Sequence, residues 1–534
     1  LQVKWQEEMR PKFGLEFRIV DTEYVRRLRR KRGIRANPWT SYPRLITSMD
    51  WAKTGDGLEY MRDVLPREPS YPRRFDILIV DEAHNVAPSP SGDSLRTSLI
   101  RRIAPHCAHH LFLTATPHNG NKLSWQGLLE LLDPQRFTCG LEPDPNQTSE
   151  VVIRRLKSSI KDKDGNPLFP KRVLKEIEIN YSSEERRIHQ ALNEYSKLRF
   201  ESLQNSQYAT THTAPLAFKF VLSTLKKRLF SSPRAFHQTL QKHRDSIFSK
   251  QEERDPLPKK AEIGILTRMI HTAESEIEKP DETTINEGFI VDNENEAVKM
   301  ASLVLPPLST DERKLLSLLS KWASENSSSA DSKLSAIVSW LKLNLFNSKE
   351  WTTRRVILFT EYTATLSLVH EILTNNGLGD SSRLMKIDGS TPPEEREAIK
   401  AAFQADPNIS PVRILLATDA ASEGIDLQNW CADLIHIEIP WNPNVMEQRN
   451  GRIDRHGQKS DVVRIWHPVG STALSAGNYQ QDDGQYLWTV CSKIDRMRED
   501  LGSVADVVAE RVRNTMLAVF VKWSFRKCST VLNH

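Results

Sequence analysis

The chain has few cysteines and no long apolar run. Its 534 residues include five cysteines, which are scattered without any paired spacing. Such usage indicates a reducing compartment rather than a disulfide framework. The sequence shows neither a signal peptide nor an apolar run of about 18 residues, so membrane insertion is not expected. These absences predict a cytoplasmic protein with no membrane partner.

The chain also lacks a strong excess of charge of either sign. Its 74 basic and 69 acidic residues give a net charge of +5, which by itself does not indicate a polyanionic partner. The basic residues do cluster, because Arg26–Arg35 holds seven of them and no acid, and Arg101 and Arg102 form a smaller group. Contacts from such clusters to phosphates raise affinity in a salt-sensitive way. A solvated helix surface explains the Arg26–Arg35 run equally well.

A group of histidines surrounds Cys107 within the segment Pro105–His110. A zinc site would need a second ligand pair at a helical or Cys-x-x-Cys spacing, and the sequence offers none. We therefore predict a turn with ordinary surface histidines immediately before the next strand, and no metal site.

The segment Phe75–His84 is an apolar run of strand type that ends in two adjacent carboxylates and a histidine. Ile77–Val80 predict a buried strand, so Asp81 and Glu82 would emerge at its carboxyl end, where parallel sheets bind ligands. Mg²⁺ is usually held through carboxylates and substrate phosphates, and a nearby carboxylate can orient or deprotonate a water. On this segment alone, acids that cap the N–H groups of a helix explain the pattern equally well.

Three further segments follow in order along the chain. Leu111–Pro117 is another strand-to-loop run, and Arg413–Gln428 and Gln448–Gln458 lie far downstream. Together with Phe75–His84, they resemble the second, third, fifth and sixth motifs of superfamily two helicases. Because all four occur in that order, the chain is identified by resemblance as a member of this superfamily.

Within the superfamily, the chain resembles the Swi/Snf-type translocases of double-stranded DNA along nearly its whole length. The matching segments are Trp5–Leu15, Leu45–Trp51, Arg355–Leu366, Ile387–Arg396 and Lys493–Val512. The last of these is similar to the bracing helix of the bacterial branch typified by the RNA-polymerase recycling ATPase. Phrases such as NPWTSYPRLITS and DEAHNVAPS are most similar to the phage-defence helicases of the DISARM systems.

The resemblance implies an ATP hydrolase that uses Mg²⁺ and a composite site. Phosphoryl transfer is catalysed largely by positioning and charge neutralisation. By resemblance, Asp81 binds Mg²⁺ and Glu82 polarises the attacking water. Arg452 and Arg455 would be arginine fingers that reach the γ-phosphate, since a spacing of three predicts that they share one face of a helix.

The alternative for Arg452 and Arg455 is a solvated helix face with salt bridges to Asp454 and Glu447.

The resemblance also implies roles for residues other than the two carboxylates and the two arginines. By resemblance, nucleotide state is coupled to DNA grip through His84, Thr114 and Thr116. Nucleotide contacts are implied for Gly424, Asp426 and Gln448. Nucleic-acid contacts are implied for Thr47, Ser48, Thr360 and Gly389.

One motif of the family is absent from the sequence. The phosphate-binding loop G-x-x-x-x-G-K-[ST] holds the β- and γ-phosphates through backbone N–H groups and a lysine. No glycine here is followed by lysine and a hydroxyl residue. In the family, the loop precedes the first DNA motif, and this sequence starts just after that point, at Leu1. We therefore expect a chain that is truncated on its amino side and that binds ATP poorly by itself.

The motif positions predict an α/β protein with two RecA-like parallel-sheet lobes, the first of them truncated, joined by a helical insertion. The predicted divisions are 1–145 for the remainder of the first lobe, 146–330 for the insertion and an acidic linker, 331–480 for the second lobe, and 481–534 for a helical brace and C-terminal extension. A first lobe with an unpaired sheet position is expected to be aggregation-prone when it is expressed alone.

Helical periodicity replaces the strand pattern between about 150 and 330. A packed core is predicted by apolar residues at helix spacing: Phe218, Val221, Leu222, Leu225 and Leu229. Another face would carry Lys226, Lys227 and Arg228, and Ser231–Pro233 predict a helix break and restart. His271–Ala297 holds nine acids against one lysine, which predicts a solvated linker, with a DNA-mimicking strap as the alternative.

The second lobe is predicted to begin near Asp331. DSKLSAIVSWL predicts a helix with one apolar face that holds Leu334, Ile337 and Leu341. Three strands are predicted at Val356–Phe359, Ile414–Thr418 and Leu434–Pro440.

These features predict an ATP-driven motor that tracks along duplex DNA without having to separate its strands. Its contacts to the DNA backbone would be largely independent of sequence. The predicted partner is double-stranded DNA in a prokaryotic cytoplasm, with defence-system proteins as further partners. Two alternatives stay open, an incomplete DNA-binding or regulatory subunit that needs the phosphate loop from upstream sequence, and an RNA-polymerase recycling ATPase.

Overall fold

The structure is a computed structural model that describes most of the chain up to residue 470. The described residues are 2–53, 55–88, 93–114, 122–155, 157, 160–206, 213–252, 287–348, 350–380, 382–419 and 425–470. The chain divides into two compact units at the junction of residues 156 and 157. The predicted brace at Lys493–Val512 lies outside the described residues. Among the helices that are described, none is long and apolar enough to cross a membrane.

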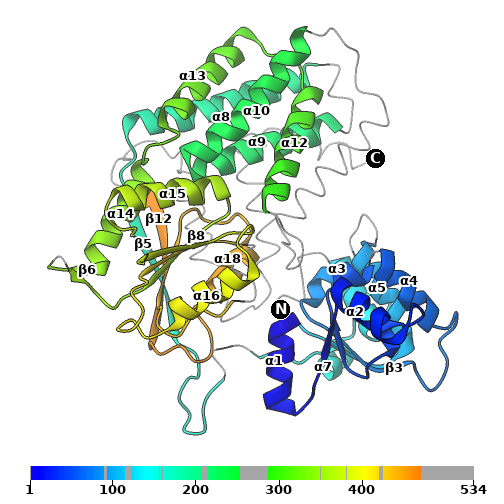
Figure 1. The fold of residues 1–534 in the computed structure, drawn as a ribbon. Coiled ribbons are helices and arrows are strands. Elements are labelled where there is room, and N and C mark those ends of the chain that lie inside the picture. The colour runs from blue at the N-terminus through cyan, green and yellow to red at the C-terminus, as the bar shows by residue number, and fades with distance from the viewer. Residues whose placement is uncertain are drawn as a thin grey trace. The chain divides into compact units, whose positions relative to one another are not determined.

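The first unit combines short parallel strands with helices (Figure 1). Strands β1 (Arg18–Val20) and β2 (Leu45–Thr47) form one parallel pair, and β3 (Phe75–Val80) and β4 (Cys107–Phe112) form another. The α-helices are α1 (Gln2–Phe13), α2 (Thr22–Arg32), α3 (Met49–Lys53), α4 (Gly55–Val64), α5 (Leu95–Ile103), α6 (Lys122–Leu132) and α7 (Pro145–Val151), and a short 3-10 helix, η2 (Ala83–Val86), follows β3. Because β3 and β4 are parallel, their carboxyl ends meet at one edge.

Strand β3 forms as predicted, but only its end is fully buried. Val80 is 4% exposed, whereas Ile77 is 54% exposed and Leu111 of β4 is 43% exposed. Alternate residues of a strand point to opposite faces, and the face that holds Leu78 and Val80 packs against apolar residues of the neighbouring helices. The prediction that Ile77–Val80 is wholly buried is therefore wrong for Ile77, and Leu78 and Ile79 are only half-buried.

This exposed face gives a testable prediction about solubility. Replacing Ile77 and Leu111 together with threonine should reduce aggregation of the chain, because both side chains add apolar area to one face of a two-stranded sheet. Static light scattering against concentration measures the effect, and the melting temperature should stay close to that of the parent chain. The matched control is Val80→Thr, which changes a buried residue of the same strand and should lower the melting temperature instead.

The histidines around Cys107 adopt a different structure from the predicted turn. Strand β4 begins at Cys107, four residues before Leu111, so His109 and His110 lie within the strand. His106 is buried, and burial lowers the pKa of its imidazole. The ring nitrogens of His110 lie 2.8 Å from the carbonyl oxygens of Leu132 and Ala104. The predicted turn is therefore wrong, and of the three histidines only His109 is exposed. No metal-binding cluster occurs in the described part of the chain.

The second unit is built on a six-stranded parallel sheet (Figure 1). Its strands are β5 (Lys171–Ile179), β8 (Val356–Thr360), β9 (Leu384–Ile387), β10 (Ile414–Thr418), β11 (Asp433–His436) and β12 (Val462–Gly470), in the order β5-β12-β11-β8-β10-β9. All five residues of β8 and of β10 are buried, as expected for a parallel sheet covered on both faces. The predicted α/β fold class with RecA-like lobes is confirmed.

Helices cover both faces of this sheet. Helix α14 (Ser332–Leu345) and helix α15 (Thr363–Asn375) pack against one face, where Leu334, Ile337 and Leu341 of α14 are buried as predicted. Helix α16 (Pro393–Gln404) packs against the other face, and helix α18 (Pro443–Asn450) follows β11. A small antiparallel pair, β6 (Phe346–Asn347) and β7 (Glu350–Trp351), follows α14.

The helical insertion is a bundle of five described helices, which Figure 1 draws above α14 and α15. They are α8 (Ser183–Gln204), α9 (Thr213–Ser231), α10 (Pro233–Glu252), α12 (Glu287–Val304) and α13 (Thr310–Asn326). The five apolar residues predicted from Phe218 to Leu229 are buried in its core. Helix α9 ends at Ser231 and α10 starts at Pro233, so the predicted break is confirmed.

One sequence interpretation of the insertion, the solvated linker, is corrected, and the basic residues of α9 prove to be largely buried. Lys226 and Arg228 are 6% and 1% exposed, and Arg228 forms an ion pair with buried Glu294 of α12. Residues 287–297 of the predicted solvated linker belong to helix α12, and Glu294 and Ala297 of that helix are buried. Residues 253–286 lie outside the described part of the chain.

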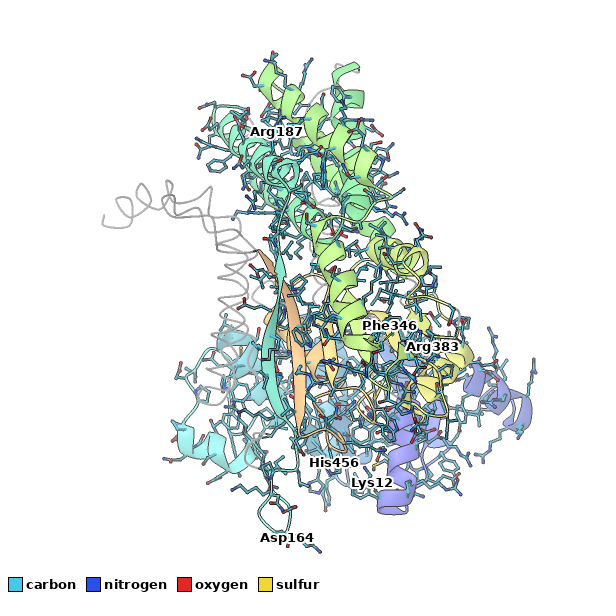
Figure 2. The ribbon with its side chains drawn as sticks, turned by 90° about the vertical axis from the view of Figure 1, so that its left-hand side faces the viewer. Lys12, Asp164, Arg187, Phe346, Arg383 and His456 are labelled. Atoms are coloured by element: carbon cyan, nitrogen blue, oxygen red, sulfur yellow. The ribbon has the colours of Figure 1, made fainter. Side chains whose placement is uncertain are left out.

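Strand β5 was not predicted, and it shows where the insertion is rooted. β5 pairs with β12 over nine residues, from Lys171 opposite Val462 to Ile179 opposite Gly470. Figure 2 shows the two strands side by side. The insertion follows β5 and leads into α14, so it leaves from and returns to the same sheet. Buried Glu185 at the start of α8 accepts a hydrogen bond from the backbone N–H of Ser332 at 2.8 Å.

Candidate functional site

Asp81 and Glu82 emerge directly after β3, at the carboxyl end that the sequence predicts. The backbone N–H of Glu82 donates to Oδ1 of Asp81 at 2.9 Å. Glu82 has φ 47° and ψ 48°, a left-handed conformation that costs energy for a residue with a side chain and that is concentrated at functional sites. Glu82 precedes η2 and makes no side-chain capping hydrogen bond to that described helix. The geometry therefore disfavours the helix-capping explanation for Glu82.

The predicted coupling residues lie against this carboxylate pair. Nδ1 of His84 is 3.0 Å from Oγ1 of Thr114 and 3.3 Å from Oε2 of Glu82. Thr114 follows β4, so the parallel pairing of β3 and β4 brings the two strand ends together. Thr116 lies outside the described residues. The structure thus joins Glu82, His84 and Thr114 in one polar cluster.

Sequence reasoning missed one residue of this site, Trp5 of α1. Its indole N–H donates to Oδ2 of Asp81 at 2.7 Å, across 76 positions of the chain. An indole donor fixes the orientation of the carboxylate and leaves its other oxygen with the Glu82 N–H. The available signal was the position of Trp5 in the first segment that resembles the translocases, but a sequence segment does not reveal its long-range partner.

If Asp81 holds Mg²⁺, as the resemblance implies, replacing Trp5 with phenylalanine should raise the Mg²⁺ concentration needed for half-maximal ATP hydrolysis by the longest polypeptide of the reading frame. The expected change is about tenfold, because partners that orient a metal ligand typically change affinity or activity by this order. Metal titration of ATP hydrolysis measures the effect. The matched control is Trp430→Phe, a partly exposed tryptophan of the second unit, which should leave the titration unchanged. Equal Mg²⁺ dependence in Trp5→Phe and the parent protein would contradict a positioning role for the indole.

Thr47 and Ser48, predicted to contact nucleic acid, lie at the end of β2 and are partly buried. The hydroxyl of Thr47 donates to the carbonyl oxygen of Val20 at 3.1 Å. The hydroxyl oxygen of Ser48 accepts from the backbone N–H of Trp51 at 3.1 Å at the start of α3. Both side chains therefore also stabilise the local backbone.

In the second unit, the two predicted arginine fingers do not share a helix face. Helix α18 ends at Asn450, and Arg452 and Arg455 lie in the turns that follow. Arg455 forms an ion pair with Asp426, so the structure brings together two residues that the sequence assigns to ATP. The helix prediction for this segment is wrong because a spacing of three is also compatible with successive turns. Gln448 is exposed on α18, and Gly424 lies outside the described residues.

The acids near these arginines bind to residues from before the insertion. Glu447 accepts two hydrogen bonds of 2.9 Å from the guanidinium of Arg172 in β5. A carboxylate oxygen of Asp454 lies 3.3 Å from Nζ of Lys157. The missed strand β5 thus helps to hold the arginine segment, which we define as residues 451–455.

A further arginine, Arg449, is buried at the end of α18. It donates to both carboxylate oxygens of Asp419, at 2.5 and 2.7 Å. Burial alone would lower the pKa of the Arg449 guanidinium, but the neighbouring Asp419 and Glu438 raise it above its ordinary value. Arg449 is therefore a fixed buried cation.

The remaining predicted residues are Thr360, at the end of β8, and Gly389, in the turn after β9. Thr360 is buried.

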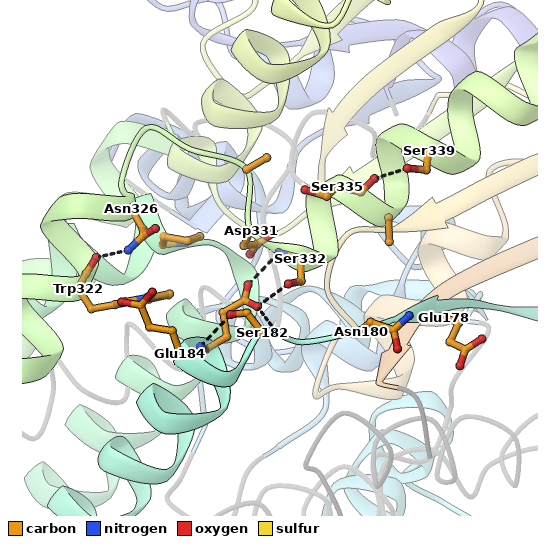
Figure 3. Close-up of a pocket in the computed structure, with 14 residues that line it drawn as sticks. Glu178, Asn180, Ser182, Glu184, Trp322, Asn326, Asp331, Ser332, Ser335 and Ser339 are labelled. Atoms are coloured by element: carbon orange, nitrogen blue, oxygen red, sulfur yellow. Dashed lines mark hydrogen bonds between the residues drawn. The ribbon is translucent and has the colours of Figure 1, made fainter. Parts of the chain in front are cut away.

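An open cavity of about 590 Å³ lies at the root of the insertion (Figure 3). Ser182 and Asp331, which cap α8 and α14, lie in its lining with Ser332. Its described lining contains acidic residues and neither lysine nor arginine. The cavity is distinct from the strand-end carboxylates and from the arginine segment in its lining residues.

Asp81 and Glu82 at the β3 end are residue types that fit Mg²⁺, whereas the phosphate-binding loop is absent from the sequence. Mg²⁺ takes oxygen ligands and is commonly held by one or two carboxylates together with phosphates. Asp81 and Glu82 supply carboxylate oxygens, and the Glu82 side chain is 41% exposed. Asp81 would hold the metal, which would neutralise phosphate charge when it is bound.

Comparison with known proteins gives matches to helicases. Residues 333–457 match the helicase conserved C-terminal domain. The chain is 23% identical to the RNA polymerase-associated proteins RapA of Yersinia enterocolitica and Serratia proteamaculans, over 86% of this chain and 41% of theirs. It is 37% identical to the uncharacterised ATP-dependent helicase YqhH of Bacillus subtilis over 20% of this chain and 18% of that protein.

The chain spans about two fifths of the length of its RapA relatives. The C-terminal part of the Fun30 ATPase domain, a solved structure, aligns with 65% of this chain and 99% of its own, at 14% identity and a TM-score of 0.33. The sequence matches support the superfamily two helicase prediction and suggest an ATPase or helicase. They do not single out the phage-defence helicases.

Proposed function

We propose that this chain is part of an ATP-driven motor that translocates along double-stranded DNA. The observation that carries the proposal is the cluster of Asp81, Glu82, His84 and Thr114 at the ends of two parallel strands. Such strand ends are where α/β sheets bind ligands. The match of residues 333–457 to a helicase domain supports the same function from the second unit.

From the family resemblance, we propose a division of labour in hydrolysis. Glu82 would accept hydrogen bonds from the attacking water and orient it, while Trp5 keeps the Asp81 carboxylate fixed. Arg452 and Arg455 would meet the negative charge that develops on the transferred phosphoryl group, as guanidinium groups do in related reactions. The ion pair of Arg455 with Asp426 would hold that arginine in place before ATP binds.

Helix α2 supports a polyanionic partner. Asp21 caps its start and Gly33, with φ +90°, follows its end. Val25 and Leu28 of this helix are buried. Its opposite surface carries the exposed residues Arg26, Arg27, Arg30 and Lys31, and Arg32 is exposed at its last position. A solvated helix needs no such one-sided excess of positive charge, so we favour contact with the phosphate backbone.

The charge-reversed variant Arg26→Glu with Arg30→Glu should bind duplex DNA more weakly and less salt-dependently. The slope of log affinity against log salt should fall by about 1 for each phosphate that the variant no longer binds. Fluorescence anisotropy over a salt series measures both quantities. The control Lys314→Glu with Lys321→Glu makes the same charge change on exposed residues of α13 and should keep the parent slope. Equal losses in both variants would mean that α2 acts only through net charge.

ATP hydrolysis tests the proposed function directly. The assay compares this chain with the longest polypeptide that its reading frame encodes, each with duplex DNA, single-stranded DNA or single-stranded RNA. We expect hydrolysis by the longer polypeptide to be stimulated most by duplex DNA. Stimulation by single-stranded RNA but not by duplex DNA would refute the translocase proposal. Hydrolysis by this chain alone would refute the prediction that the phosphate loop is essential.

A second candidate is association with RNA polymerase. It is favoured by the RapA relatives, which align with 86% of this chain. Affinity capture of core polymerase by the chain would support this candidate. A capture experiment that recovers no polymerase would count against it. A role in phage defence rests on the resemblance of short phrases alone, and loss of protection against phage infection on gene deletion would support it.

A further inference from the structure

Glu438, which follows β11, is a buried carboxylate where several elements meet. It is 7% exposed, and the hydroxyl of Thr360 at the end of β8 donates to its Oε2 at 3.0 Å. The backbone N–H of Glu361 donates to Oε1, and the guanidinium of Arg449 lies 3.5 Å from the same oxygen. Ionised carboxylates only accept hydrogen bonds, and this one is surrounded by donors.

The helical insertion supplies one more donor. Ser231, at the end of α9, is fully buried and donates its hydroxyl proton to Oε2 of Glu438 at 3.1 Å. It is separated from Glu438 by 207 positions of the chain. The insertion therefore contacts the sheet through a polar bond as well as through apolar packing.

A chain of hydroxyl groups continues from this bond into the insertion. Oγ1 of Thr365 in α15 lies 2.6 Å from the hydroxyl of Ser231 and 2.7 Å from that of Ser232. Each hydroxyl carries one proton. Since Ser231 donates to Glu438, Thr365 must donate to Ser231, and Ser232 to Thr365. The oxygen of Ser232 then accepts from the backbone N–H of Ala235 at 3.2 Å. All the donors point toward Glu438.

We call the hydrogen-bonded series Ser232, Thr365, Ser231 and Glu438 the relay. Its Glu438 end reaches the arginine segment through Arg449. Arg449 contacts Glu438 and binds Asp419 with two hydrogen bonds, and its carbonyl oxygen accepts from the backbone N–H of Arg452 at 3.0 Å. Between Arg449 and Arg452 lie only two residues, Asn450 and Gly451. Asn450 is also fixed, because its Oδ1 lies 2.9 Å from Nε2 of buried His436. A shift of Arg449 would therefore move the backbone that carries Arg452.

A buried lysine fixes the insertion end of this relay. Nζ of Lys333, a buried residue of α14, donates to the carbonyl oxygen of Phe230 at 2.6 Å and also to that of Ser231. The break between α9 and α10 is thus held from the sheet side by a cation. Buried hydroxyl and carboxylate groups that lose a partner cost energy, so the relay favours one arrangement of all its members.

From these contacts we infer that Ser231, Ser232 and Thr365 are positioning residues for ATP hydrolysis, holding Glu438 and through it Arg449 and the arginine segment. This inference rests on the proposed function for the role of Arg452 and Arg455. The relay itself is a property of the second unit, so it can be tested whether or not the chain hydrolyses ATP.

The test uses matched hydroxyl deletions. Thr365→Val removes the hydroxyl and keeps the branched shape, while Thr365→Ser keeps the hydroxyl. Ser231→Ala with Ser232→Ala breaks the same relay from the insertion side. The control is Ser196→Ala with Ser223→Ala, because both hydroxyls donate to carbonyl oxygens within their own helices, Leu192 in α8 and Phe220 in α9.

Amide hydrogen exchange of peptides that cover residues 443–455 is the first readout. We expect exchange to accelerate by about tenfold in Thr365→Val and in the Ser231/Ser232 double variant, while the Ser196/Ser223 control stays at the parent rate. Thr365→Ser should recover most of the protection. Unchanged exchange at 443–455 in both relay variants would overturn the inference, and so would equal acceleration along the whole unit.

Steady-state ATP hydrolysis by the longest polypeptide of the reading frame is the second readout. A positioning role predicts that kcat falls by about tenfold in the relay variants with KM for ATP nearly unchanged, because the arginines act on charge that develops in the transition state. A rise in KM at constant kcat would overturn the role. If the parent protein hydrolyses no ATP, the proposed function fails, and the exchange measurement alone decides whether the relay holds the segment.

Discussion

Replacing Glu82 with glutamine in the longest polypeptide of the reading frame is expected to lower ATP turnover by about 10²- to 10⁴-fold, which is the usual contribution of a positioned acid or base. Glutamine keeps the size of the side chain but cannot take a proton from water. Oε2 of Glu82 lies 3.3 Å from Nδ1 of His84 and the Glu82 side chain is 41% exposed, so the carboxylate can reach both His84 and a solvent molecule. ATP binding should change by no more than a few-fold, since Asp81 keeps its contacts to Trp5 and to the backbone.

Single-turnover hydrolysis and equilibrium nucleotide binding separate these effects. The control is Glu68→Gln, an exposed acid of the same unit, which should keep the parent turnover. Asp81→Asn gives the complementary pattern, with a higher Mg²⁺ concentration needed for half-maximal hydrolysis as well as lower turnover. If Glu82→Gln hydrolyses ATP at the parent rate, the role given to this carboxylate is wrong, and the left-handed backbone at Glu82 needs another explanation.

Replacing Asp433 with alanine should destabilise the second unit by about 3–5 kcal/mol, the usual cost of removing one partner from a buried ion pair. Asp433 begins β11 and is 1% exposed. Its carboxylate accepts two hydrogen bonds of 2.7 Å from Arg354, two of 2.8 and 2.9 Å from Arg464, and one of 2.9 Å from the indole of Trp466. The substitution would leave all of these donors without their shared acceptor.

Chemical denaturation at several pH values tests this prediction. Burial raises the pKa of Asp433, but hydrogen bonds from Arg464 and Arg354 outweigh it and keep that pKa below its ordinary value. A depressed pKa stabilises the fold above the unfolded-state value of about 3.9, and this contribution is lost as the pH falls through the folded-state pKa. The difference between parent and variant should therefore be constant near neutral pH and shrink below about pH 4.

The control for Asp433 is Asp311→Ala, an acid with 73% of its side chain exposed. Its effect on unfolding should stay within about 0.5 kcal/mol, as for most surface substitutions. An Asp433→Ala variant that unfolds at the denaturant concentration of the parent would show that the two arginines find other partners.

The sequence predicted elements whose signal is local. The apolar spacing of α9 and α14, the Ser231–Pro233 break and the strands β8 and β10 were all predicted, because each depends on residues within one or two turns. The strand-end carboxylates were also found, since an apolar run that stops at two acids marks the end of a strand.

The misses share a long-range cause. In β5, only Ile177 and Ile179 alternate with charged residues, which is too short a pattern to predict a strand, and its strand partner begins at Val462. The burial of Arg228 depends on Glu294, and the orientation of Asp81 depends on Trp5. Local periodicity carries no information about such partners. The turns around Arg452 and Arg455 were mistaken for a helix because a spacing of three does not distinguish the two.

The pairing of β5 with β12 also has a consequence for the order of folding. During synthesis, β5 leaves the ribosome nearly 300 residues before its partner, from Lys171 to Val462. Its backbone N–H and C=O groups cannot form their ladder hydrogen bonds until that strand has been synthesised, and closing so long a loop delays the pairing. The insertion helices fold from local contacts and shorten the effective span between the two strands. We therefore expect the edge of this sheet to be completed last, after the insertion bundle, and to be the site where a slowed or truncated synthesis leaves an unpaired strand.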